Sequence, residues 1–238
     1  MNSRLRPSAV FFDVDFTLIY PGPTFQGDGY RTFCERYGID VDPVLFERAV
    51  DAALPILDER EDDAYSTELF VAFTRHIIEQ MGGCGPQLDA CAREIYDEWA
   101  ACHHFHLYDD VRATLEALAG AGLRLGVISN THRSLDSFLS HFALDHLIAA
   151  SVSSFEHGYM KPHPSVFSAA LGRAGVRAAE AVMVGDSVRQ DIEGALAAGM
   201  RAVLLNRSGV PHPREPELAA RGVHSIRSLE ELPGLLHF

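Results

Sequence analysis

The sequence predicts an α/β protein with a three-layer core, in which helices cover both faces of a parallel β-sheet and an all-helical domain is inserted. Two patterns predict this fold. From residue 109 to the end of the 238-residue chain, short apolar runs alternate with segments of helical periodicity. Residues 21–105 show helical spacing throughout and no convincing strand. We therefore expect a core over residues 1–20 and 106–238 and a helical cap over residues 21–105.

The first strand and the inserted helices follow from the spacing of apolar residues. The run that starts at Ala9 contains β-branched and aromatic residues and ends at Asp13, as buried strands do. The turn-rich run Tyr20-Pro21-Gly22-Pro23 then separates the strand from the insertion. Apolar residues at helical spacing mark four helices. They are Tyr30, Phe33, Cys34 and Tyr37; Leu45, Phe46, Ala49 and Val50; Leu69, Phe70, Phe73, Ile77 and Ile78; and Cys91, Ile95 and Trp99.

The second half of the chain alternates helix and strand. Strands are expected near 123–129, 147–152, 181–184 and 201–205, and helices near 110–118, 135–142, 164–171 and 192–198. Asp110 is expected to cap the first of these helices. Near-continuous apolar strands joined by helices are typical of a parallel sheet with right-handed crossovers. Such a sheet binds its ligand beyond the carboxyl ends of its strands.

Composition and charge exclude several classes of function. Hydrophobic residues make up 47% and charged residues 22%, as in an ordinary globular protein. The formal net charge of −13 disfavours binding to nucleic acids and to anionic membranes. No apolar run approaches the roughly 18 residues of a membrane span, and no secretory pattern is seen, so we expect a cytoplasmic location. The oligomeric state stays open.

The cysteines give no sign of a metal site. Their spacings match no common zinc motif, so we expect reduced, mostly buried thiols. The four cysteines are Cys34, Cys84, Cys91 and Cys102.

Two carboxylates lie where the first strand ends. Asp13 and Asp15 are one residue apart, and alternate residues of an extended segment face the same side. Two such charges ~4 Å apart repel by ~4 kcal/mol at an effective dielectric constant of ~20. A turn or a helix cap would be an ordinary reason for either residue. A bound cation, a shared proton or a reaction would explain the pair.

Further polar residues follow other predicted strands, so the same edge of the sheet should collect them. Each has an ordinary alternative as a helix cap, a surface lysine or part of a tight turn. They are Ser129, Asn130, Lys161, Asp186 and Asp191. Together with Asp13 and Asp15, these side chains carry a formal charge of −3. A divalent cation would balance it, and oxygen ligands without His or Cys favour Mg²⁺. Lys161, Ser129 and backbone N–H groups would then bind an anion, and phosphate fits best.

At this point the sequence resembles the haloacid dehalogenase superfamily, in its phosphatase-like branch with a helical cap. The four motifs that carry the resemblance are Asp13-Val14-Asp15-Phe16-Thr17, Ser129-Asn130, Lys161-Pro162 and Gly185-Asp186-Ser187 through Asp191. They occur in the family's order and span nearly the whole chain. The resemblance implies a Rossmann-like core and Mg²⁺-dependent hydrolysis of a small-molecule phosphate monoester through an aspartyl-phosphate.

The resemblance also implies a role for each motif residue. Asp13 would be the nucleophile, and Asp15 would protonate the leaving oxygen and then deprotonate water. Lys161 would balance negative charge as a catalytic and phosphate-binding residue. The phosphoryl oxygens would be held by Ser129 and the backbone of Asn130.

Metal ligands and supporting residues are implied in the same way. Mg²⁺ would bind the Asp13 carboxylate, the Asp15 backbone carbonyl and Asp186. Thr17 would orient Asp13, and Asp191 would orient Lys161 or a metal-bound water, with Ser187 as a further supporting residue. Phe16 departs from the family's usual Gly, and Gln190 from a frequent Asn.

Alternatives remain within and outside this chemistry. A haloacid dehalogenase needs no second acid at the position of Asp15 and no metal. Phosphomutases and phosphonate hydrolases of the family use a lysine from the cap, and Lys161 is the only lysine in the chain. A non-catalytic binding protein on the same fold is the alternative from another class. The substrate is not predicted, nor is any contact between it and the arginines of the insertion or the histidines at its end.

Overall fold

The computed structural model describes residues 7–58 and 62–236, and the chain divides into two compact units. The first unit comprises Met1–Tyr20 and Leu107–Phe238, and the second comprises Pro21–His106. The chain passes between the units within a small two-stranded sheet formed by β2 (Ile19–Pro21) and β3 (Phe105–Leu107).

The first unit is built on a six-stranded sheet with the order β5-β4-β1-β6-β7-β8, and every neighbouring pair is parallel. Its strands are β1 (Ala9–Phe12), β4 (Arg124–Ser129), β5 (Ile148–Ser153), β6 (Ala181–Gly185), β7 (Arg201–Leu205) and β8 (His224–Ile226). All four residues of β1 and all five of β6 are buried, because these central strands are covered on both faces. The predicted α/β fold class is confirmed.

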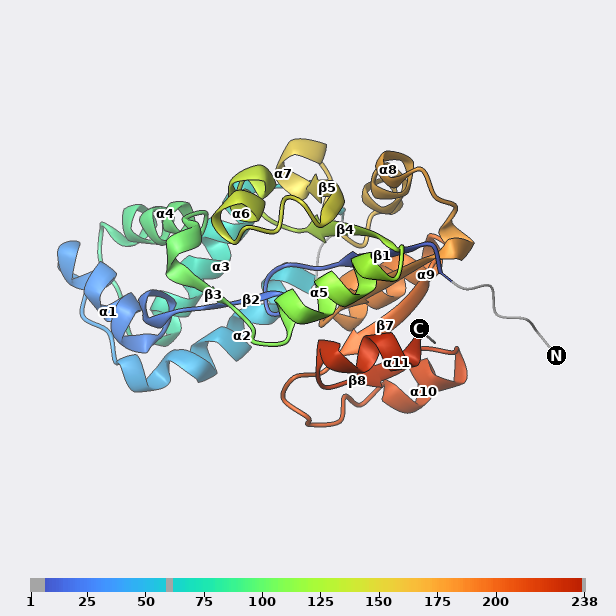
Figure 1. The fold of residues 1–238 in the computed structure, drawn as a ribbon. Helices are drawn as coiled ribbons and strands as arrows, with labels where there is room; N and C mark the ends of the chain where they lie inside the picture. Colours follow the sequence, from blue (N-terminus) through green and yellow to red (C-terminus); the bar gives the residue numbers. More distant parts are fainter. Residues whose placement is uncertain (1–6, 59–61, 237–238) are drawn as a thin grey trace. The chain divides into compact units, whose positions relative to one another are not determined.

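Helices lie on both faces of this sheet (Figure 1). On one face, α8 (Pro164–Ala174) and α9 (Gly194–Ala197) share a core with Phe11, Met183 and Leu204. On the other face, α5 (Val111–Gly120) packs against α11 (Leu232–Leu235). The remaining helices of the unit are α6 (Leu135–His141), α7 (Ser154–His157) and α10 (Glu215–Ala220).

Local signals set several of these boundaries. Pro164 begins α8, where its missing N–H is harmless, and Gly175 ends the helix in the left-handed region at φ 64°. Asp110 is the N-cap residue of α5, as predicted, but its side chain makes no hydrogen bond to the start of the helix. It accepts hydrogen bonds from Arg207, Ser228 and the backbone of Leu229 instead.

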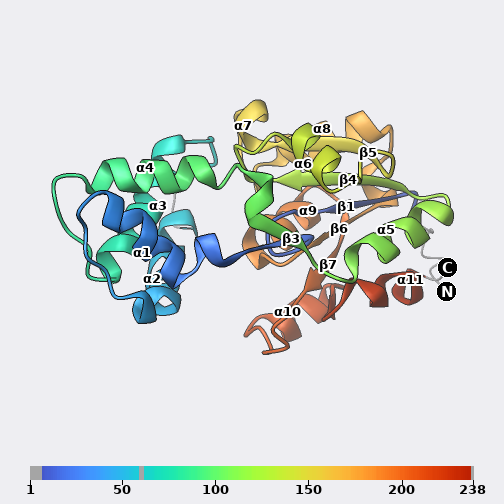
Figure 2. The same cartoon turned by 60° about the vertical axis from the view of Figure 1, so that its left-hand side comes forward.

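The second unit is almost entirely helical. Its helices are α1 (Gly27–Arg36), α2 (Phe46–Asp58), α3 (Thr67–Gln80) and α4 (Leu88–Glu98), and Figure 2 shows them gathered in one bundle. Short 3₁₀ turns lie at Pro23–Phe25, Pro43–Leu45 and Cys102–His104. The Ser66 hydroxyl caps α3 by accepting a hydrogen bond from the backbone N–H of Leu69. In α1 and α4, Cys34 and Cys91 are buried, and their sulfur atoms lie 3.8 Å apart without a disulfide.

None of the helices within residues 7–58 and 62–236 combines the length and the hydropathy that crossing a membrane requires.

Candidate active site

The sheet brings three loop segments together at the carboxyl ends of β1, β4 and β6. Phe12 pairs with Val127 on one side and with Val184 on the other, so the three strands end at nearly the same level. The chain then continues into Asp13 after β1, Asn130 after β4 and Asp186 after β6. The backbone N–H of Asp13 donates to the carbonyl of Val184 at 2.9 Å.

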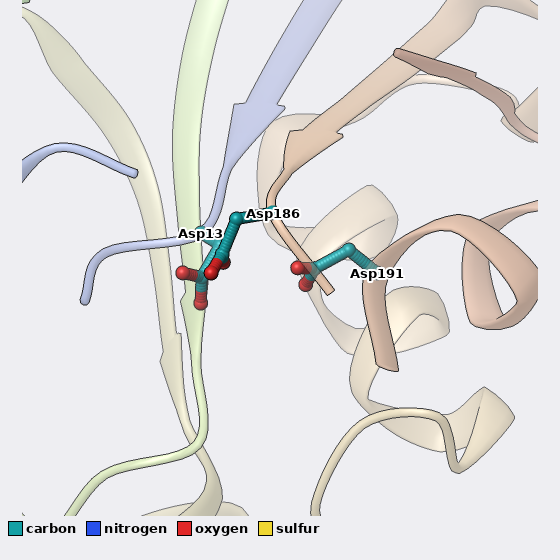
Figure 3. A group of neighbouring side chains, drawn as sticks. All are labelled: Asp13, Asp186 and Asp191. Atoms are coloured by element: carbon teal, nitrogen blue, oxygen red, sulfur yellow. The ribbon is translucent and has the colours of Figure 1, made fainter. Parts of the chain in front are cut away.

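Three carboxylates converge at this edge. Oxygen atoms of Asp13, Asp186 and Asp191 all lie within 4.8 Å of one another. Figure 3 shows the side chains of Asp13 and Asp186 next to each other, with Asp191 reaching toward them from the helical segment that follows β6. Asp13 and Asp191 are buried, whereas Asp186 is exposed.

Lys161 lies between two of these carboxylates. Its Nζ atom is 2.5 Å from Asp13 Oδ1 and 2.6 Å from Asp191 Oδ1, and the residue is only 1% exposed. Burial by itself would lower the pKa of Lys161, but the charges of Asp13 and Asp191 outweigh it and raise that pKa. The buried cation therefore stays charged, since two carboxylates and their hydrogen bonds replace its hydration.

Burial and like charges oppose ionisation of the acidic groups. Burial raises the pKa of Asp13 well above its usual value, Lys161 lowers it, and Asp191 and Asp186 raise it again. The pKa of Asp186 is raised to about 7 by the surrounding protein and by the charge of Asp191. The pKa of Asp186 is raised although Asp186 itself is exposed to solvent. The site is thus more negative than its own cation can balance.

The cluster also fits a hard divalent cation. Its donors are carboxylate oxygens, with no His or Cys among the described residues of the cluster, and such donors favour Mg²⁺. Both oxygens of Asp191 are already engaged, Oδ1 by Lys161 and Oδ2 by the backbone N–H of Ser187 at 3.0 Å. Asp13 and Asp186 are therefore the carboxylates that remain for a metal.

Gly185 is required for the position of Asp191. A Cβ atom at residue 185 would lie 2.2 Å from Asp191 Oδ2, closer than two such atoms can approach. The following segment, Val188–Glu193, is a π-helical turn. Ser187 is its N-cap residue, and the Ser187 hydroxyl accepts a hydrogen bond from the N–H of Gln190. The turn starts four residues before the predicted helix at 192–198, and it carries Asp191 toward Lys161.

Asp15 has a different cation for a partner. Arg133 Nη1 lies 3.0 Å from Asp15 Oδ1 and 3.3 Å from Oδ2, and the arginine side chain is fully buried. Arg133 was not among the residues predicted for the site. The available signal was a permanent cation four residues after Ser129, within a loop predicted to reach an acidic site. With Arg133 included, the formal charge of the site falls from −3 to −2.

Asn130 braces the loop that carries Lys161. Its Oδ1 accepts from the backbone N–H of Lys161 at 2.7 Å, and its Nδ2 donates to the carbonyl of the same residue at 3.1 Å. The same Nδ2 donates to Gln190 Oε1 at 3.0 Å, so Gln190 links this loop to the segment after β6. The side chain of Asn130 is therefore engaged by the Lys161 backbone and by Gln190. Ser129 is buried as the last residue of β4.

The residues after Asp15 also differ from expectation. The hydroxyl of Thr17 donates to Asp186 Oδ1 at 3.4 Å, so it supports a different carboxylate from the predicted Asp13. Phe16 adopts a left-handed backbone conformation with φ 63°, and the residue is 46% exposed. An L-residue there costs ~1–2 kcal/mol, which explains why glycine is usual at this position in the family.

In the second unit, one of the histidines and two of the arginines considered above have partners within that unit. His104 contacts Thr24 Oγ1 at 3.1 Å and Glu98 Oε2 at 3.0 Å. Arg36 and Arg75 form exposed ion pairs with Glu94 and Asp89. These contacts give the three residues structural roles within the bundle.

Comparison with known proteins identifies the family of this chain. The sequence model of the haloacid dehalogenase-like hydrolase family matches residues 61–205. The ribulose-1,5-bisphosphate 5-phosphatase of Halopiger xanaduensis is 30% identical, over 96% of this chain and 99% of its own length. The N-acylneuraminate-9-phosphatase of Mus musculus is 32% identical, over 98% of this chain and 94% of its own. The chain belongs to the haloacid dehalogenase-like hydrolase family.

Solved structures share the fold over nearly the whole chain. A HAD phosphatase from Thermococcus onnurineus superposes with a TM-score of 0.64 at 26% identity, covering 97% of this chain and 98% of its own. The HAD-hydrolase YfnB from Bacillus subtilis gives a TM-score of 0.74, covering 98% and 100% of the two chains. At 20% identity, the second likeness shows the fold alone.

Proposed function

We propose that this chain is a Mg²⁺-dependent phosphatase that hydrolyses a small-molecule phosphate monoester through an aspartyl-phosphate on Asp13. The observation that carries the proposal is the separation of two carboxylates between two cations. Asp13 lies 2.5 Å from Lys161 within the acidic cluster, whereas Asp15 is held by Arg133. One carboxylate thus meets the reacting phosphorus while the other handles protons. The two relatives described above carry phosphatase names, which supports the same chemistry.

In the first step, a carboxylate oxygen of Asp13 attacks phosphorus and forms a new P–O bond. The bond from phosphorus to the leaving oxygen breaks, and that oxygen takes a proton from the carboxylic acid of Asp15. The products are an acyl phosphate on Asp13, a free alcohol and an Asp15 carboxylate. Splitting one difficult hydrolysis into two displacements is the usual gain from a covalent intermediate.

In the second step, the Asp15 carboxylate removes a proton from water as the water oxygen attacks phosphorus. The bond between phosphorus and the Asp13 oxygen breaks, so inorganic phosphate leaves and both aspartates return to their starting forms. General acid–base help of this kind is typically worth ~10²- to 10⁴-fold.

The other motif residues stabilise charge around the reacting phosphoryl group. Lys161 balances negative charge on Asp13 and on the phosphate, and Asp191 keeps its ammonium group aimed at Asp13. Ser129 and the backbone N–H of Asn130 bind phosphoryl oxygens. Mg²⁺, held by Asp13, Asp186 and the Asp15 carbonyl, would shield the negative charges of the nucleophile and the phosphate from each other.

We further propose that the helical segment predicted over residues 21–105 acts as the cap that selects the substrate. A lid that excludes water would protect the acyl phosphate until the attacking water is in place. In this reading, the core carries the chemistry and the cap carries specificity. Truncating the cap should therefore widen the range of accepted phosphate esters.

The test uses the purified full-length protein and a panel of phosphate monoesters, including p-nitrophenyl phosphate. We expect phosphate release that stops with excess EDTA and returns with added Mg²⁺. Asp13→Asn should be inactive, because an amide is a far poorer nucleophile than a carboxylate. Full activity in EDTA, or no hydrolysis of any ester, would contradict the proposal.

A further inference from the structure

Arg133 is the most deeply buried charged side chain at the site, and it contacts the residue that sequence analysis assigned to proton transfer. Its side chain is fully buried, while that of Asp15 is 18% exposed. A buried guanidinium without an anionic partner would cost several kcal/mol, so the pairing is strongly favoured once the chain has folded. The arginine has no role among the family motifs described above.

The loop between β4 and α6 holds Arg133 in place before any ligand binds. The backbone N–H of Arg133 donates to Thr131 Oγ1 at 3.0 Å. The carbonyl of Thr131 in turn accepts from Ser154 Oγ at 3.4 Å and from the N–H of Phe155 at 3.3 Å. These hydrogen bonds connect residues within the loop and connect the loop to the segment after β5. The Arg133 side chain is therefore preorganised.

The pairing divides the carboxylates of the site into two groups. Within the described residues, the cluster that could hold a metal contains Asp13, Asp186 and Asp191 but not Asp15. Lys161 serves Asp13 and Asp191, and Arg133 serves Asp15. Without Arg133, the Asp15 carboxylate would lose the cation that balances it, while Lys161 and any bound metal would still attract it.

We infer that Arg133 is a positioning residue that holds the Asp15 carboxyl group apart from the metal cluster and from Lys161, and so reserves Asp15 for proton transfer. This inference rests on the proposed function. Nη1 of Arg133 contacts both oxygens of Asp15, at 3.0 Å and 3.3 Å. An ammonium group in the place of Nη1 would keep part of this contact.

The test is a double-mutant cycle with Arg133→Met, Asp15→Asn and the double variant, because residues that act through one contact are not additive. Methionine fills much of the space of the arginine stem without its charge. We expect Arg133→Met to slow the first step, measured as alcohol release in a single turnover, ~10- to 100-fold for an alkyl phosphate, whose leaving group needs a proton, and under ~5-fold for p-nitrophenyl phosphate. In the Asp15→Asn background, the same substitution should cost under ~3-fold with either ester.

A second readout does not depend on turnover. Titration with Mg²⁺ alone, followed by calorimetry or thermal shift, should show tighter binding to Arg133→Met than to the wild type, because the released carboxylate joins the cluster. That gain should vanish in the double variant. Arg133→Lys should restore most of the alkyl phosphate activity and the wild-type metal affinity. Arg177→Met, which removes an exposed arginine paired with Glu180, is the matched control and should change neither.

The outcomes separate the two proposals. Equal losses from Arg133→Met in both backgrounds, with unchanged metal affinity, would show a purely structural arginine and overturn the inference. If Arg133→Met does not fold, Arg133→Lys is compared with the wild type instead: whatever part of the first-step rate it loses must be larger for the alkyl phosphate than for p-nitrophenyl phosphate, and a uniform loss overturns the inference as well. If the wild-type protein hydrolyses no phosphate ester, the proposed function is overturned. A gain in Mg²⁺ affinity on Arg133→Met that appears only when Asp15 is present would still support the positioning role.

Discussion

The only lysine of the chain, Lys161, lies between Asp13 and Asp191, with its Nζ atom 2.5 Å from one carboxylate and 2.6 Å from the other. The two acidic residues come from different strand ends, so the lysine joins the loop after β1 to the segment after β6. All three side chains are at most 10% exposed. The contact links the stability of the core to the charge of the proposed nucleophile.

Removing this lysine should destabilise the protein as well as the site. Lys161→Met leaves two buried carboxylates side by side, and breaking a buried pair from one side costs ~3–5 kcal/mol. We expect a loss of that size in the free energy of unfolding, measured by urea titration. Adding Asp191→Asn should recover part of the loss. A decrease below ~1 kcal/mol would show that solvent already screens the pair.

Gly185 should tolerate no side chain. Gly185→Ala places a Cβ 2.2 Å from Asp191 Oδ2 and must displace the residue that orients Lys161. We expect a stability loss of ~1–3 kcal/mol. Activity should fall by up to ~10²-fold, since small displacements at a reacting group have effects of that size. The matched control is Gly172→Ala within α8, where a Cβ would meet nothing within 4 Å and should be neutral or stabilising by up to ~1 kcal/mol. Equal effects at both positions would contradict this account.

Phe16 should lower the stability of the protein through its left-handed backbone conformation. Its φ of 63° costs ~1–2 kcal/mol for an L-residue, and glycine would relieve it while losing ~0.5–1 kcal/mol of unfolded-state entropy. Phe16→Gly should therefore unfold at the same or a slightly higher urea concentration. Ala143→Gly, at φ 50°, is a control with the same backbone geometry. A loss above ~1 kcal/mol for Phe16→Gly alone would mean that packing of the ring outweighs the strain.

The Asp110–Arg207 pair should give the protein a pH-dependent contribution to stability. Burial would raise the pKa of Asp110, but hydrogen bonds from Arg207 and from the backbone of Leu229 lower it overall. The folded-state pKa thus lies below the unfolded value of about 3.9. The pair stabilises the fold above that value, and the contribution is lost as the pH falls through the folded pKa.

Asp110→Asn should accordingly lower the free energy of unfolding at pH 7 by ~1–2 kcal/mol, and the difference from wild type should shrink below about pH 4. Asp89→Asn removes an exposed partner of Arg75 and should change stability by at most ~1 kcal/mol at any pH. Urea titrations at several pH values measure both variants. A constant difference between Asp110→Asn and wild type from pH 3 to pH 7 would argue against the pairing.

The strands that build the sheet could be predicted because β1, β4, β6 and β7 are short, apolar and bounded by polar residues. A parallel sheet then brings whatever follows each strand to one edge, so the meeting of Asp13, Lys161 and Asp186 followed from topology. Their roles in a reaction stay predictions. The short elements β8 (His224–Ile226) and α10 were not predicted, since they carry too few residues for a periodic signal.

Side-chain partners within the site were harder to predict than its location. Arg133 reaches Asp15 because its loop folds back through Thr131, and no residue spacing encodes that path. Thr17 was predicted to orient Asp13, but its hydroxyl points to Asp186 at 3.4 Å. Such contacts depend on backbone geometry beyond the strand ends, where neither helical nor strand periodicity applies.

Trapping the covalent intermediate tests the central claim most directly. Rapid quench of each variant with p-nitrophenyl phosphate and Mg²⁺, followed by intact-mass measurement, should show the mass of one added phosphoryl group on Asp15→Asn. That variant keeps the nucleophile but lacks the base that activates water, so the acyl phosphate accumulates. Asp13→Asn should show no adduct and no turnover. A phosphoryl adduct on Asp13→Asn, or near-normal turnover by it, would contradict the assignment of Asp13 as the nucleophile.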